Sequence, residues 1–119
     1  MTDTSAPDAL DQFLGEFREE LKKRAGLRAL VKEADEARER VLAEVAVKAR
    51  RQPIPKPPSL DEAKIVAKAS ADYAQATARW LEQYKALEHV EATIKHMETR
   101  WETWRTRAAS ARQLRRMEG

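Results

Sequence analysis

The chain has 119 residues, of which 36% are charged and only three are glycine, and its formal net charge is +3. This composition suits one elongated helical domain better than a globule with a thick core. Because the chain has no cysteine, disulfides and thiolate metal sites are excluded, which fits a reducing compartment. No signal-peptide pattern or long apolar run is present. We therefore expect a cytoplasmic protein without membrane contact, in which residues 1–7 are a flexible N-terminus and residues 8–119 form one domain.

A first helix is predicted from about residue 8 to residue 51, capped by Ser5 or Asp8. Its apolar stripe slips in phase near Gly26, and glycine inside a helix costs on the order of 1 kcal/mol relative to alanine. The segment Ala25–Leu27 is therefore a candidate for a bend or break, which would divide this helix in two. The apolar positions of the stripe are Leu10, Leu14, Phe17, Leu21, Leu27, Leu30, Ala34, Ala37, Val41 and Val45.

Residues 52–59 are predicted to form a stiff turn, because prolines occupy positions 53, 55, 57 and 58 and proline lacks a backbone donor and restricts the preceding residue. The turn ends in Ser59-Leu60-Asp61-Glu62, a capping-box sequence. Neither glycine nor proline occurs from Leu60 to Met117, and alanine is abundant. A second, uninterrupted helix is therefore expected from about residue 60 to residue 117.

The second helix has an apolar residue at every seventh position, and a companion series three residues further on is apolar except at Gln83. Together the two series form the narrow seam of a coiled coil. The first series is Val66, Tyr73, Trp80, Leu87, Ile94, Trp101 and Ala108, and the second is Ala69, Ala76, Val90, Met97, Trp104 and Ala111.

These elements predict an all-α fold: a long antiparallel helical hairpin, similar to a coiled coil, closed by the proline-rich turn. An antiparallel pairing places Val31 beside Trp80 and Leu10 beside Trp101. It also sets a group of acidic residues in the first helix against three arginines of the second. The acidic residues are Asp8, Asp11, Glu16, Glu19 and Glu20, and the arginines are Arg100, Arg105 and Arg107.

The second helix is the longer one, so from about Glu102 it is expected to extend past the first helix. Trp104, Ala108, Ala111 and Leu114 would then have no partner within the chain. A two-helix hairpin with a thin seam is marginally stable, so we predict a homo-oligomer. Its expected contacts are Trp80, Leu87, Ile94, Met97, Trp101, Trp104, Ala108 and Leu114.

The sequence has neither a glycine-rich phosphate loop nor the local signature of a catalytic triad. We therefore expect no enzymatic activity and no cofactor. His89 and His96 are seven residues apart and share one face of the second helix, but neither belongs to a Glu-x-x-His pair of the kind that helical-bundle metal sites use. We expect both to be exposed to solvent and to bind no metal.

Residues 95–119 contain seven basic and three acidic side chains, interleaved with Trp101 and Trp104. Arginine contacts phosphates, and an exposed indole stacks on unpaired bases, so this end is a candidate site for single-stranded nucleic acid. The alternative interpretation is that both tryptophans belong to a core and the arginines pair with acidic residues or remain solvated. The candidate nucleic-acid-binding residues are Lys95, Arg100, Trp104, Arg105, Arg107, Arg112, Arg115 and Arg116.

The segment from Trp101 to Arg116, which reads WETWRTRAASARQLRR, resembles the C-terminal helix of small bacteriophage-encoded helical proteins. Some of these proteins are recombination mediators that bind single-stranded DNA as ring oligomers. The resemblance implies an accessory factor of phage-type recombination or replication. The alternative is a coiled-coil scaffold or adaptor that binds another protein through the extending C-terminal helix.

Overall fold

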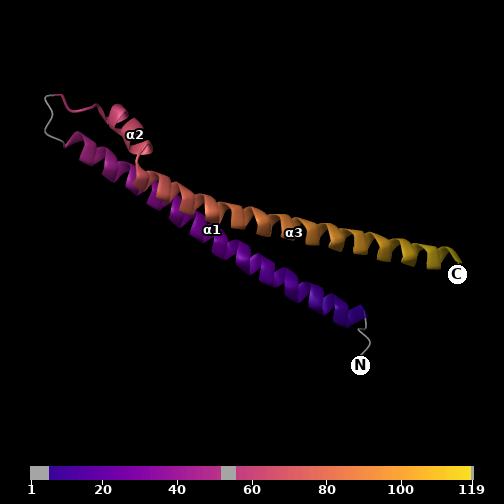
Figure 1. Ribbon diagram of the computed structural model, residues 1–119. Helices are drawn as coiled ribbons and strands as arrows, with labels where there is room; N and C mark the ends of the chain where they lie inside the picture. The colour runs from indigo at the N-terminus through magenta and orange to yellow at the C-terminus, as the bar shows by residue number, and fades with distance from the viewer. Residues whose placement is uncertain (1–5, 52–55, 119) are drawn as a thin grey trace. The chain divides into compact units, whose positions relative to one another are not determined.

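The computed structural model describes residues 6–51 and 56–118. Within these residues the protein is all-helical, with α1 at Ala6–Arg50, α2 at Leu60–Lys68 and α3 at Ala71–Glu118 (Figure 1). The predicted all-α class is therefore confirmed. The expected cap at Ser5, residues 1–5 of the predicted flexible N-terminus, and residues 52–55 of the predicted turn lie outside the described residues. None of the described helices is long and apolar enough to cross a membrane.

Helix α1 is continuous through Gly26, so the predicted break there is wrong. The covered face of α1 does not slip in phase at this point. It continues after Leu21 at spacings of three or four residues, through the half-buried residues Arg24, Leu27, Val31, Asp35 and Arg38. Polar side chains therefore occupy seam positions where only apolar residues were expected.

The predicted helix from residue 60 to residue 117 is interrupted between α2 and α3. The backbone N–H groups of Ala69 and Ser70 donate to the carbonyl oxygens three residues earlier, at 3.1 and 3.0 Å, which is the spacing of a tightened final turn. Ser70 then starts α3, because its Oγ accepts a hydrogen bond from the N–H of Tyr73 at 3.2 Å. Ser59 caps α2 as predicted, with its Oγ accepting from the N–H of Glu62 at 3.2 Å.

Residues 25–87 form one compact unit, called here the central unit. Its buried cluster joins Leu42 and Ala46 of α1 to Ala63 and Ala67 of α2, and Val45, Ala49 and Tyr73 pack against it. The seam prediction is wrong for Val66, which is 57% exposed, and for Ala69, also exposed. The interruption after Ala69 separates α2 from α3, and α2 turns its alanine face toward α1.

The register in the central unit also differs from the predicted one. The guanidinium of Arg38 lies over the ring of Trp80, 4.3 Å from its centroid, whereas Val31 was expected at this place. The indole of Trp80 stacks on Tyr84 at a centroid distance of 5.2 Å. The pairing of α1 with α3 in this unit is therefore antiparallel, as expected, with Arg38 in the place expected for Val31.

Residues 1–24 and 88–119 form the second compact unit, called here the terminal unit. In its described part, α3 contributes Val90, Ile94 and Met97, which are buried. The ring of Phe13 stacks on Trp101 with a centroid distance of 6.2 Å, so Trp101 meets Phe13 in addition to the expected Leu10. On the α1 side of the unit, the half-buried apolar residues are Leu10, Phe13, Leu14, Phe17 and Leu21.

Candidate nucleic-acid interface

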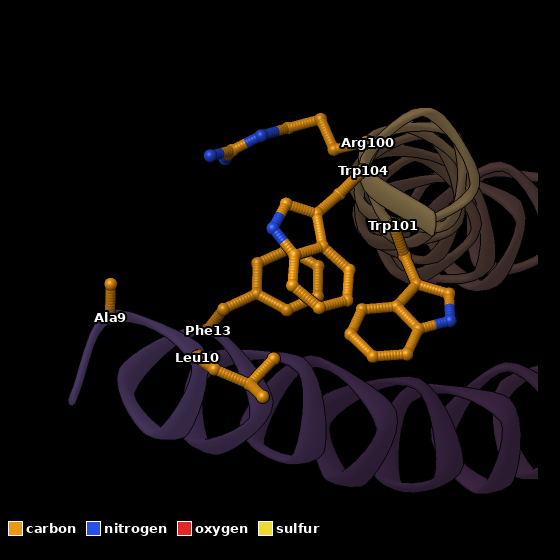
Figure 2. Close-up of a pocket in the computed structure, with 6 residues that line it drawn as sticks. All are labelled: Ala9, Leu10, Phe13, Arg100, Trp101 and Trp104. Carbon is orange, nitrogen blue, oxygen red and sulfur yellow. The ribbon is translucent and has the colours of Figure 1, made fainter. Parts of the chain in front are cut away.

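An aromatic hollow with a volume of about 250 Å³ lies between the beginning of α1 and the later part of α3 in the terminal unit. Figure 2 shows Leu10 and Phe13 pointing from α1 toward α3, and Trp101 and Trp104 pointing from α3 toward α1. Antiparallel packing puts these residues together, because each group lies on the covered face of its own helix. The six residues that line the hollow are Ala9, Leu10, Phe13, Arg100, Trp101 and Trp104.

The rings in and beside this hollow are nearly parallel. Phe13 and Trp101 lie at an interplanar angle of 9°, and Trp101 and Trp104 at 24° with their centroids 5.3 Å apart. The ring contact of Trp104 is thus with Trp101 of its own helix, and Trp104 also lines the hollow together with Leu10 and Phe13 of α1. It is nevertheless 53% exposed, so much of its indole is available to another planar group.

Arg100 stands at the edge of the aromatic hollow. Its guanidinium lies 5.6 Å from the centroid of the Phe13 ring, within the range of a cation–π contact. The residue is exposed, and Figure 2 shows its side chain extending away from α3. Arg100 makes no ion pair within the described part of the chain, so its charge can meet an anion bound near the rings.

A second depression, called here the basic depression, lies on α3 directly beyond the aromatic hollow and has a volume of about 660 Å³. Trp104 lines both. The floor is formed by small residues, among them Ala108 and Ala111, which allow a ligand to approach the helix backbone closely. Glu102 is the one carboxylate in a lining that otherwise consists of Trp104, Arg105, Thr106, Ala108, Ala109, Ala111, Arg112 and Arg115.

All eight candidate nucleic-acid-binding residues are exposed. Arg105 pairs with Glu102 on its own helix, with an Nη1–Oε1 distance of 3.3 Å. Among the residues that the structure describes, the other cationic members have no carboxylate partner. These unpaired cations are Lys95, Arg100, Arg107, Arg112, Arg115 and Arg116.

The alternative in which arginines of α3 pair with the acidic start of α1 is not found for Glu19 and Glu20, whose ion-pair partners lie within α1. Glu19 pairs with Lys22 at 3.3 Å, and Glu20 pairs with Lys23 at 3.0 Å, both within α1. Pairs three residues apart on one helix form with little cost in side-chain order. Arg100 and Arg107, which have no ion-pair partner within the described residues, are available to other anions.

The residues expected to mediate oligomerisation divide into three groups. Ile94 and Met97 are buried by the chain itself, which leaves them no surface for a second copy. Trp104 and Leu114 are 53% and 59% exposed. The remaining four, Trp80, Leu87, Trp101 and Ala108, are half-buried.

The sequence patterns did not indicate the α1 side of the aromatic hollow as a functional surface. Phe13 precedes Leu14 of the apolar stripe, and its spacing of four from Phe17 gave the available signal, since residues at that spacing share a face. His89 and His96 are exposed, as predicted. No group of three or more His, Cys, Asp or Glu residues in the described ranges is arranged to hold a metal ion.

Comparison of the chain with protein-family models, with curated proteins and with solved structures finds no match. The terminal unit itself indicates a function through its geometry: a half-exposed tryptophan is shared by an aromatic hollow and an arginine-lined depression. Such an arrangement offers one face to planar rings and another to negative charges.

Proposed function

We propose that this protein is a non-enzymatic, oligomeric helical protein of the cytoplasm that binds single-stranded nucleic acid through the terminal unit. The observation that carries the proposal is the position of Trp104 between the aromatic hollow and the basic depression. The resemblance of the segment from Trp101 to Arg116 to helices of phage recombination mediators agrees with it. We accordingly propose a role as an accessory factor in recombination or replication.

In this mechanism an unpaired base stacks on the exposed part of Trp104, and the adjoining phosphates contact Arg112 and Arg115 in the basic depression. Stacking of one base on an aromatic side chain contributes about 1–3 kcal/mol, which is too little for tight binding by one chain. Several such ends in one oligomer add avidity without a deep pocket. The arrangement favours single strands, because bases in a duplex are already stacked on one another.

The test is a salt titration of binding to a fluorescently labelled single-stranded oligonucleotide. We expect affinity to fall steeply between 50 and 200 mM salt, values typical of such titrations. The double variant Arg112→Ala with Arg115→Ala should reduce the slope of log K against log [salt] by about 1.4, the amount expected for two phosphate contacts to a single strand. Lys64→Ala with Lys68→Ala removes the same charge from α2 and should leave the slope unchanged.

The stacking step has its own variants. Trp104→Ala should weaken binding about tenfold or more at fixed salt, whereas Trp104→Phe, which keeps a ring, should retain most of the affinity. No binding to any single strand at low salt would reject the proposal. Equal loss in Trp104→Ala and Trp104→Phe would show that the ring does not act as a stacking platform.

The alternative function is a scaffold or adaptor that binds another protein. It is favoured by Leu114 and Met117, which are 59% and 77% exposed at the end of α3 and would suit a partner's helical groove. The same titration separates the two functions, because apolar docking changes little with salt while phosphate binding is lost. Leu114→Ser should disrupt a protein complex and leave oligonucleotide binding intact.

A further inference from the structure

A groove in the central unit runs beside the seam between α1 and α3, and it shares no lining residue with the candidate nucleic-acid interface. Its volume is about 350 Å³. Ala34, Ala37 and Val41 line it from α1, and Ala76 lines it from α3. The charged residues around it have both signs: Glu44, Lys48, Asp72 and Arg79.

The α1 wall of this groove is part of a longer apolar stripe. Leu27, Ala34, Ala37 and Val41 are half-buried, and Leu30 is 45% exposed. Their alternating spacing of three and four residues is that of a coiled-coil seam. The face of α1 that packs inside the chain runs instead through residues such as Arg38 and Leu42. In the central unit, α1 therefore has two adjacent seams, of which the chain fills one.

The unfilled seam, formed by Leu27, Leu30, Ala34, Ala37 and Val41, is called here the open seam. The charged residues beside it indicate which partner could bind there. Glu33 and Arg40 are exposed, lie seven residues apart along the same edge of the stripe, and have no ion-pair partner within the described residues. A second α1 laid antiparallel across the stripe brings Glu33 of one copy next to Arg40 of the other, twice over. Leu30 then meets Val41, and Ala34 meets Ala37. The pattern is complementary to itself, as a two-fold interface requires.

We propose that two copies of the chain associate through this groove, with their α1 helices antiparallel across a two-fold axis between Ala34 and Ala37. This inference rests on the oligomeric part of the proposed function and not on its nucleic-acid part. The small residues at the centre allow the two helices to approach closely. Reciprocal Glu33–Arg40 pairs set the antiparallel register, because in a parallel pair Glu33 of one copy and Arg40 of the other would not meet.

The first test is sedimentation equilibrium of the full chain over a concentration series. Glu33→Arg places two arginines opposite each other at both ends of the interface and should raise the dimer dissociation constant about tenfold or more. Adding Arg40→Glu to this variant exchanges the two charges and should restore the wild-type constant. Glu39→Arg makes the same charge change on the side of α1 that faces away from the stripe and should leave the constant unchanged.

The second test uses the absence of cysteine from the chain. Ala37→Cys lies beside the proposed axis and should form a disulfide-linked dimer rapidly under mild oxidation, whereas Lys32→Cys on the opposite side of α1 should not. Far-UV circular dichroism confirms that each variant is helical before the comparison.

A wild-type chain that stays monomeric at high micromolar concentration would overturn the proposal. So would a charge exchange that fails to restore the dimer, or equal cross-linking of the two cysteine variants. Oligonucleotide binding is measured on the same samples. A monomer that still binds the oligonucleotide would reject the groove as an interface and leave the nucleic-acid proposal standing. A dimer that does not bind the oligonucleotide would support the groove as an interface and reject the nucleic-acid proposal.

Discussion

Gly26 lies in the middle of α1, where its backbone is helical and no left-handed conformation requires glycine. A Cβ added at this position would meet no atom within 4 Å. Gly26→Ala should therefore stabilise the protein by about 0.5–1 kcal/mol, through the lower backbone entropy of alanine in the unfolded chain. Urea unfolding followed by circular dichroism measures the change. Ala25→Gly, in the same turn and also exposed, should shift the midpoint in the opposite direction.

Arg38 explains why the stripe of α1 was predicted to slip. Its side chain is 20% exposed, its Nη2 lies 2.7 Å from Oδ1 of Asp35, and its guanidinium covers the ring of Trp80. A long cationic side chain buries its aliphatic stem while its charge pairs with a carboxylate and a π face. A pattern that counts only apolar residues passes over such a position and continues along the neighbouring face, in this case through Ala34, Ala37 and Val41.

At the scale of elements, Ser70 is the residue that divides the second helical stretch. Its Oγ donates to the carbonyl of Ala67 at 2.6 Å and accepts from the N–H of Tyr73 at 3.2 Å. It thereby satisfies polar backbone groups at the end of α2 and the start of α3, which a helix terminus otherwise leaves unpaired.

Ser70→Ala should lower the free energy of unfolding by about 1 kcal/mol, the usual cost of losing a serine cap. The measurement is the urea midpoint together with the slope of the transition. Ser110→Ala is the matched control, because Ser110 is exposed within α3 and alanine suits a helix interior. A stabilised Ser70→Ala variant would show that a continuous helix is compatible with the packing of Ala63 and Ala67, and would contradict this role of Ser70.

The two serine caps show what the sequence could and could not predict. Ser59 follows prolines and precedes Asp61 and Glu62, so the start of α2 was readable from local chemistry. Ser70 stands among alanines, and the heptad repeat continues across it from Val66 to Tyr73. The break depends on the contact of Ala63 and Ala67 with α1, where both are 0% exposed, and such long-range packing has no local signal. The part of the candidate site that lies on α3 was predictable from the sequence. The contribution of Phe13 was not, because it depends on how α1 is aligned with α3.

At the scale of the molecule, each unit has its own cluster of buried residues. The central unit is buried around Leu42 and Ala46, and the terminal unit around Ile94 and Met97. Beyond Trp101 every described residue of α3 is exposed except Ala108 and Ala111. Four of the unpaired candidate arginines lie there, namely Arg107, Arg112, Arg115 and Arg116. The part of the terminal unit that carries the candidate interface is therefore its least packed part.

Amide hydrogen exchange tests this distribution on the whole chain. In dilute protein without ligand, amides near Leu42–Ala46 and Ile94–Met97 should exchange slowly, and those from Arg105 to Glu118 quickly, because sparsely packed helix ends open at little free-energy cost. A saturating single-stranded oligonucleotide should slow exchange at residues 100–115 and leave the central unit unchanged, since binding orders the segment that it contacts. Protection that instead appears only around Ala34–Val41 would place the oligonucleotide in the groove and contradict the assignment of the two surfaces.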